Sequence, residues 1–110
     1  MGAPAIASIV MVPFPFSDLS ASKLRPAVVL ANAGRGDWTL CMVTSNPYGD
    51  SKAVRIDVSD LVRGKLNRES YVRPLKLFTA HESLMVREVG RLRKESFDRI
   101  VDAVVRSLRP

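Results

Sequence analysis

The chain is poor in the residues that build metal centres and covalent cross-links. Its 110 residues include one cysteine, Cys41, and one histidine, His81. A single cysteine excludes an internal disulfide, and this one lies in an apolar run, which predicts an inert core thiol in a reducing compartment. Cysteine, histidine and carboxylate residues show no clustered spacing of the kind that binds a metal, so we expect neither metal nor cofactor.

Long apolar runs and a basic leader segment are also missing. No stretch reaches the roughly 20 apolar residues that a membrane-spanning helix needs. The N-terminus lacks the basic region of a signal peptide. We therefore expect a cytoplasmic protein that binds no membrane. A chain of 110 residues is predicted to form a single domain, residues 1–110.

Positive charge is what the chain has in excess. It carries 17 Lys and Arg residues against 11 Asp and Glu residues, a formal net charge of +6. This balance favours an anionic partner. The densest basic segment contains Arg63, Lys65, Arg68, Arg73 and Lys76, with Tyr71 among them. Cations interleaved with an aromatic residue at sheet edges suit single-stranded nucleic acid. A solvated basic face explains the same pattern equally well.

The hydrophobic pattern predicts several short strands followed by one helix. Apolar, β-branched segments are expected to form strands at 6–12, 27–31, 38–44, 53–58, 71–78 and 84–92. In the fourth of these, Val54, Ile56 and Val58 alternate with charged residues, as in a strand with one buried face. Apolar residues recur at helical spacing over 94–108, which predicts an amphipathic C-terminal helix. The predicted fold is α+β and mainly β: a strongly bent antiparallel sheet or small barrel.

Prolines are expected to mark the ends and irregularities of the strands, because proline cannot donate to a sheet ladder. Pro13 and Pro15 are predicted to end the first strand. Pro26 is predicted to be the first residue of a strand, and Pro74 to lie at an edge or a bulge. Pro26 also restricts Arg25 to extended backbone. Arg25 then presents a fixed fork of donors, which matches carboxylates and phosphates.

Three other features have both a structural and a functional interpretation. Phe14 and Phe16 are expected to plug one end of the sheet, and the alternative is that one of them stacks on a base. Thr44 and Ser45 follow a buried strand, where turn hydrogen bonds are the favoured interpretation and a second polar site is the alternative. His81 is predicted to lie in a turn, and a catalytic role for it is less favoured.

The segment VMVPFPFSDLSASKLRPAVVLA resembles the opening of the MazF/PemK family of toxin endoribonucleases. VTSNP resembles the second motif of that family, and SYVRPLKLFTA, followed by VREVGRL and a terminal helix, resembles the closing half of one subgroup. The likeness extends over residues 6–108, and its first motif is the most specific. It implies an SH3-like antiparallel barrel, a homodimer and neutralisation by a cognate antitoxin. It also implies sequence-specific, metal-independent cleavage of single-stranded RNA by the 2′-hydroxyl, which leaves 2′,3′-cyclic phosphate and 5′-hydroxyl ends.

The resemblance places catalytic roles on Arg25, Thr44 and Ser45. The residues expected to contact RNA are Phe16, Ser17, Asp18, Lys23, Arg63, Lys65, Arg68, Tyr71, Arg73 and Lys76. Some members carry a catalytic carboxylate in the first loop, where this chain offers only Asp18. Arginine has a pKa above about 12, so we expect Arg25 to stabilise charge rather than to act as a base.

Two other functions fit the same fold. One is a toxin that poisons DNA gyrase by binding and has no active site. The other is a non-catalytic RNA-binding module with an SH3-like sheet. The combination of Arg25 with Thr44 and Ser45 favours the nuclease, because a protein that only binds gyrase has no need of all three.

Overall fold

The computed structural model describes residues 1–109 and shows seven strands with one C-terminal α-helix in that part of the chain. The strands are β1 (Ser8–Pro15), β2 (Ser22–Gly34), β3 (Asp37–Thr44), β4 (Val54–Ile56), β5 (Leu61–Gly64), β6 (Ser70–His81) and β7 (Arg87–Leu92). The helices are the short 3-10 turns η1 (Val58–Asp60) and η2 (Glu82–Leu84), and α1 (Lys94–Leu108). The predicted helix 94–108 is therefore confirmed.

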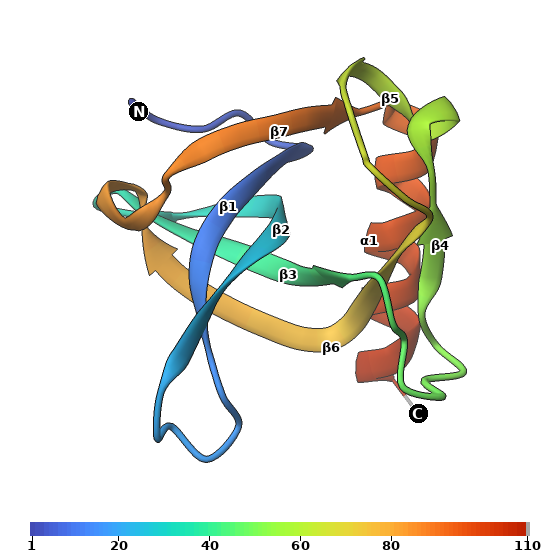
Figure 1. The fold of residues 1–110 in the computed structure, drawn as a ribbon, viewed down its shortest axis with the longest axis horizontal. Coiled ribbons are helices and arrows are strands. Elements are labelled where there is room, and N and C mark those ends of the chain that lie inside the picture. The colour runs from blue at the N-terminus through green and yellow to red at the C-terminus, as the bar shows by residue number, and fades with distance from the viewer. Residues whose placement is uncertain (110) are drawn as a thin grey trace.

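All seven strands belong to one antiparallel sheet that bends round on itself (Figure 1). The order of strands across the sheet is β4-β6-β3-β2-β1-β7-β5. The two edge strands, β4 and β5, do not pair with each other, so the sheet is open rather than a closed barrel. α1 packs beside β6 and β4. The predicted mainly β fold with a C-terminal helix is confirmed. The barrel that the resemblance implies is not closed, because β4 and β5 do not pair.

The central strands are buried on both faces. Along β1, Ile9 and Val10 are both fully buried but point into different apolar clusters. One cluster includes Ile100 and Val104 of α1, and the other includes Trp38 and residues of β2, β3 and β6. Burial on both faces explains why these strands are almost continuous apolar runs rather than alternating ones.

Pro13 lies inside β1, which contradicts the expectation that it ends the strand, whereas Pro15 is the last residue of β1. β1 pairs with β2 as far as Pro15, but with β7 only as far as Met11. Phe16 donates its N–H across the β1–β2 hairpin. The strand period of two therefore turns the nitrogens of Pro13 and Pro15 to the other side, where no strand pairs. Proline is tolerated there because no ladder donor is needed.

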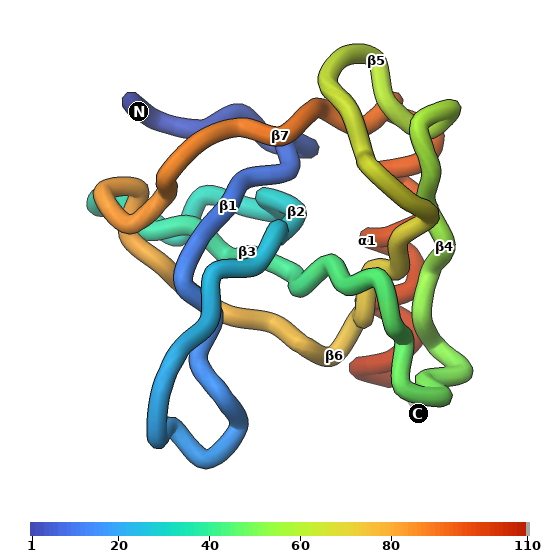
Figure 2. Tube along the Cα trace, viewed as in Figure 1, coloured from blue at the N-terminus to red at the C-terminus, as the bar shows by residue number. Residues whose placement is uncertain are grey.

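The loop before Arg25 is shorter than expected. β2 begins at Ser22, so Pro26 is an internal strand residue and not the first one. β3 pairs with β2 only from Ala27 onward, so Pro26 sits before that ladder starts. The ends of β1 and β2 beyond this point form a two-stranded arm that projects from the body of the molecule (Figure 2). Arg25 thus stands at the base of the arm.

Pro74 is predicted to lie at a sheet edge or in a bulge, and the structure places it in a bulge. The register of β6 against β3 shifts between Cys41 and Val43, so residues 73–76 stand opposite Met42 alone. The side chain of Pro74 is fully buried there. The cations on either side of Pro74 line the site described below.

Two expected strands are shortened in the structure by 3-10 turns. Val58 belongs to η1 and is exposed, because Asp57 caps that turn by accepting the N–H of Ser59. The alternation that begins at Val54 therefore ends at Ile56. The last strand begins at Arg87 rather than at residue 84, because η2 precedes it.

The start of α1 is held by η1 rather than by a cap of its own. Arg93, at the N-cap position, makes no side-chain cap hydrogen bond. Its backbone N–H donates to the carbonyl of Asp60 at 2.8 Å, and the Ser96 hydroxyl donates to the Asp60 carboxylate at 2.7 Å. No helix within residues 1–109 is long and apolar enough to cross a membrane.

Candidate functional site

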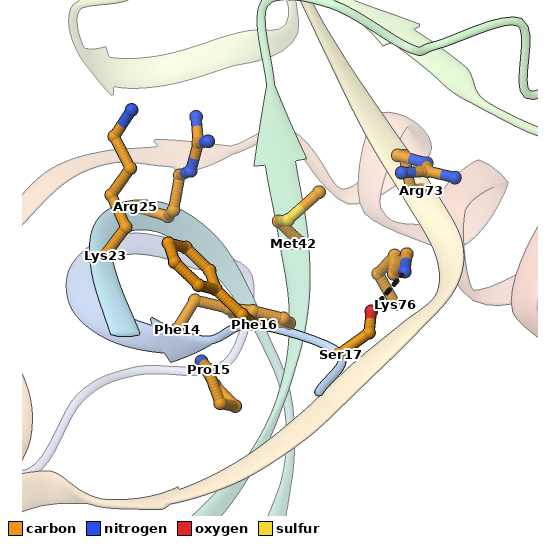
Figure 3. Close-up of a pocket in the computed structure, with 9 residues that line it drawn as sticks. All are labelled: Phe14, Pro15, Phe16, Ser17, Lys23, Arg25, Met42, Arg73 and Lys76. Atoms are coloured by element: carbon orange, nitrogen blue, oxygen red, sulfur yellow. Dashed lines mark hydrogen bonds between the residues drawn. The ribbon is translucent and has the colours of Figure 1, made fainter. Parts of the chain in front are cut away.

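Two surface cavities meet at Arg25, which lines both of them. The hydroxyl cavity, of about 280 Å³, is lined by Met11, Arg25, Pro26, Val43, Thr44, Ser45, Lys65, Leu66, Asn67, Arg68, Ser70, Arg87 and Val89. The aromatic cavity, of about 190 Å³, is lined by Phe14, Pro15, Phe16, Ser17, Lys23, Arg25, Met42, Arg73 and Lys76 (Figure 3). The structure therefore brings Arg25, Thr44 and Ser45 together, as the resemblance implies.

Thr44 supplies a buried, fixed hydroxyl at the end of β3. Its Oγ1 accepts the N–H of Asn46 at 3.2 Å and donates to the Asn46 carbonyl at 3.1 Å. The turn interpretation of this threonine is therefore confirmed. Ser45 follows it, exposed, on the wall of the same cavity. The turn bonds hold Thr44 in one orientation and leave the Ser45 hydroxyl facing solvent.

Cations dominate the hydroxyl cavity. Lys65 and Arg68 reach it from the segment between β5 and β6, and Arg87 reaches it from β7. Together with Arg25 they make four cations, and no carboxylate lines the cavity among residues 1–109. Such a concentration of one sign of charge attracts an anion.

The sequence did not single out Arg87. It is one cation in a strand of mixed charge, and nothing in that local pattern separates it from an ordinary solvated residue. Its place in the cavity depends on the pairing of β7 with β1, where Arg87 stands opposite Met11. That pairing joins residues far apart in the chain, so knowledge of the sheet order is the signal that would have found it.

The two phenylalanines of the arm have different roles. Phe14 is buried and packs against Phe78, with ring centroids 5.0 Å apart, so its predicted plugging role is confirmed. Phe16 is 44% exposed and lines the aromatic cavity, so the same expectation is wrong for Phe16. Figure 3 shows Phe16 and Met42 between Lys23 and Arg25 on one side and Arg73 and Lys76 on the other. An exposed ring framed by cations is suited to stacking on a base.

Arg73 is the most firmly held cation of the aromatic cavity. Its Nε donates to a carboxylate oxygen of Asp50 at 3.1 Å, and its guanidinium lies 5.9 Å from the ring centre of Tyr48. The backbone N–H of Lys52 lowers the pKa of Asp50, and Arg73 lowers it further, in spite of partial burial. On the same side of the cavity, Lys76 donates to the Ser17 hydroxyl at 3.3 Å (Figure 3).

Two residues expected at the RNA surface are bound elsewhere. Arg63 is held by both carboxylate oxygens of Glu88, at 3.0 and 2.9 Å. Tyr71 donates its hydroxyl to Glu69 at 2.5 Å, which raises the pKa of Tyr71. Neither lines a cavity with Arg25.

The two candidate bases also lie outside both cavities. Asp18 is exposed on the arm and accepts hydrogen bonds from the backbone and the hydroxyl of Ser20, which lower its pKa. His81 is the last residue of β6, and its Nδ1 accepts the N–H of Ser83 at 3.1 Å, which caps η2. The structure therefore brings no carboxylate or imidazole of the described residues to Arg25. Cys41 is buried as expected, and burial raises the pKa of its thiol to about 12.

The chain is thus a small, mainly β protein, an open and strongly bent antiparallel sheet with a cation-lined cavity on its surface. Residues 6–108 match the family model of the PemK-like, MazF-like toxins of type II toxin-antitoxin systems, so the chain belongs to this family. No group of three or more His, Cys, Asp or Glu residues within residues 1–109 is placed to hold a metal ion.

Solved structures share the fold at low sequence identity. A MazE–MazF structure from Deinococcus radiodurans has a TM-score of 0.73 and 18% identity, with 96% of each chain covered. A mycobacterial endoribonuclease in complex with its cognate antitoxin has a TM-score of 0.70 and 16% identity, with 98% of this chain and 95% of that chain covered. The Mycobacterium tuberculosis toxin MazF-mt6 has a TM-score of 0.67 and 17% identity, with 90% and 95% covered. The comparison with curated proteins found no match.

Proposed function

We propose that the chain is a sequence-specific endoribonuclease that cleaves single-stranded RNA without a metal ion. The observation that carries this proposal is the meeting of Arg25, Thr44 and Ser45 in one cavity whose other charged residues are all cations. Membership of the toxin family supports it, as do the solved neighbours of the same fold that are named endoribonucleases.

The proposed reaction uses the nucleophile that RNA itself carries. The 2′-oxygen forms a bond to the adjacent phosphorus while the bond from phosphorus to the 5′-oxygen breaks. The 2′-hydroxyl proton leaves to water, and the departing 5′-oxygen takes a proton from water. The products are a 2′,3′-cyclic phosphate and a 5′-hydroxyl. Alignment of the reacting oxygen and stabilisation of the crowded phosphorane are then the tasks of the protein.

Arg25 is suited to the second task because its fork can donate to two non-bridging oxygens of one phosphate. The Ser45 hydroxyl can donate to the same phosphate. The Thr44 hydroxyl already donates to the Asn46 carbonyl, so it can only accept, for example from the 2′-hydroxyl. Lys65, Arg68 and Arg87 surround the phosphate with positive charge. Asp18 lies outside the cavity with a lowered pKa, so we assign it no proton transfer.

The nuclease proposal is tested by incubating purified protein with a long single-stranded RNA, with and without EDTA. Cleavage at recurring sequences in both samples, with cyclic phosphate at the new 3′ ends, is the expected result. Loss of cleavage on chelation, restored by an added divalent ion, would contradict the metal-independent mechanism. Binding without any cleavage would favour the RNA-binding module. Inhibition of gyrase supercoiling without RNA cleavage would favour the gyrase poison.

We also propose that the protein acts as a cytoplasmic homodimer that a cognate antitoxin neutralises. One neighbouring structure is an endoribonuclease in complex with its cognate antitoxin, and another is a MazE–MazF structure. Exposed apolar residues on β6 and α1, among them Leu75, Leu77, Val105 and Leu108, are available to an interface. Light scattering at micromolar concentration is expected to give twice the mass of the chain. A monomer at that concentration would contradict the dimer.

A further inference from the structure

We propose that the aromatic cavity selects a guanine base of the RNA over adenine, with Arg73 contacting the edge of that base. This proposal rests on the proposed function, because it takes single-stranded RNA as the ligand. It adds the identity of one base, which neither the family nor the fold supplies.

The first argument is the shape and character of the cavity. Phe16, at 44% exposure, offers a ring face, and Met42 lies beside it. Arg73 and Lys76 stand across the cavity from Phe16 (Figure 3). A base stacked on Phe16 therefore turns its edge toward these two cations. Stacking alone accepts every base, so selectivity must come from the edge.

The second argument is the hydrogen-bonding character of the lining. Lysine and arginine side chains only donate hydrogen bonds. The polar side chains that line the cavity, among residues 1–109, are four cations and the Ser17 hydroxyl. That hydroxyl already accepts from Lys76. The side chains of the cavity thus offer many donors and no free carboxylate or amide acceptor.

Only some bases present acceptors that match a cavity wall made of hydrogen-bond donors. Guanine presents two adjacent acceptors, O6 and N7, which an arginine fork can meet together. Adenine presents its N6 amino group beside either ring acceptor, N1 or N7, so an adenine edge would turn a donor toward the cations without a partner. Uracil presents the acceptors O2 and O4 on either side of the N3–H donor and has no adjacent acceptor pair, so its affinity should fall between those of guanine and adenine.

The third argument is the fixed position of Arg73. Asp50 engages its Nε, which leaves the two terminal nitrogens of the guanidinium for a ligand. The side chains of Arg73 and Asp50 are only 20% and 18% exposed. A planar group held in this way discriminates between bases better than a mobile surface cation does.

The test measures binding of fluorescent heptamers of 2′-fluoro-uridine that carry one central guanine or adenine. The 2′-fluorine removes the nucleophile, so no heptamer can be cleaved by 2′-hydroxyl attack. We expect the guanine heptamer to bind at least about fivefold more tightly than the adenine heptamer. Arg73→Gln should abolish or reverse that ratio, because glutamine pairs with N6 and N7 of adenine. Lys76→Gln, which leaves the pair of Arg73 with Asp50 intact, should narrow the ratio.

Arg35→Gln is the matched control, because Arg35 is exposed between β2 and β3 and lines neither cavity. It removes the same charge and should keep the guanine-to-adenine ratio. Equal binding of the guanine and adenine heptamers by the wild-type protein would overturn the inference. A guanine-to-adenine affinity ratio that is unchanged in both Arg73→Gln and Lys76→Gln would also overturn it. A guanine preference without RNA cleavage would refute the proposed nuclease and leave this inference standing.

Discussion

The positive charges of this protein fall into two groups with different surroundings. In the hydroxyl cavity, none of the four cations makes a salt bridge with any of residues 1–109. Around α1 and the edge strands, several cations are paired instead: Arg55 with Glu69, Arg63 with Glu88, and Lys94 with Asp98. Unpaired like charges repel one another, so their concentration at one place indicates a binding surface rather than a stabilising feature.

Arg25 gives the sharpest test of this comparison. Arg25→Ala should reduce the cleavage rate by about 10²- to 10³-fold, because a preorganised donor to developing negative charge is lost. Arg25→Lys keeps the charge and should bind RNA almost as well, yet cleave at least about tenfold more slowly. Single-turnover cleavage beside equilibrium binding measures both effects.

Circular dichroism serves as the control for folding in both Arg25 variants, since Arg25 is only partly buried. A wild-type cleavage rate for Arg25→Lys would show that positive charge alone suffices and that bidentate hydrogen bonding by the guanidinium has no role.

Phe16 should matter for binding and much less for chemistry. Removing the ring in Phe16→Ala is expected to weaken RNA binding by about tenfold, because one base loses its stacking partner. The single-turnover rate at saturating RNA should stay close to that of the wild type. Leu19→Ala is a suitable control, since Leu19 is 78% exposed on the same arm and lines neither cavity. An equal loss in both variants would show that the arm acts through its general apolar surface.

The salt dependence of RNA binding should separate free cations from paired ones. Each cation that neutralises a phosphate contributes about 0.7 to the slope of log affinity against log salt for a single strand. The double variant Lys65→Gln with Arg68→Gln should therefore flatten the slope by more than one, without a change in the cleaved sequence. Arg63→Gln should change the slope less, because Glu88 already pairs with Arg63. An equal change of the salt slope per removed cation in Arg63→Gln and in the double variant would contradict this distinction between free and paired cations.

The contribution of Asp60, which links η1 to α1, to the stability of the fold should be lost in acid. Burial raises the pKa of Asp60, but hydrogen bonds from Ser96, the Asp57 backbone and Arg99 outweigh it, and the net pKa is lowered from 3.8. A folded-state pKa below the unfolded value adds stability above pH about 4, and this stability is lost as the pH falls below that value. Urea unfolding at pH 7 and pH 3 should show a smaller drop for Asp60→Asn than for the wild type. An identical drop would mean that Asp60 contributes little to the pH dependence.

Local patterns in the sequence predicted the parts of the molecule that local physics decides. The apolar periodicity gave the bounds of α1, and the abrupt change from apolar to polar after Val43 located Thr44. Contacts between distant strands decided the rest. Pro13 remains inside a strand because no partner pairs with that side of β1, which the local sequence does not reveal.

The same limitation applies to the site. Residue type predicted Arg25 as an anion ligand, because an arginine before a proline has a restricted backbone. The basic segment, however, divides between a cavity and an ion pair: Arg68 lines the hydroxyl cavity, while Arg63 binds Glu88. That division depends on the register of β5 against β7. Charge counts alone treat the two arginines as equals.

The pairing of β1 with β7 also has a consequence for synthesis. The hydroxyl cavity needs Met11, near the start of the chain, and Arg87 and Val89, near its end. A nascent chain emerging from the ribosome lacks β7 until most of the domain has been translated, and domains fold as units. The complete hydroxyl cavity therefore assembles only after β7 has been translated. Under the proposed function, a nascent chain that still lacks β7 carries no complete active cavity that could cleave RNA.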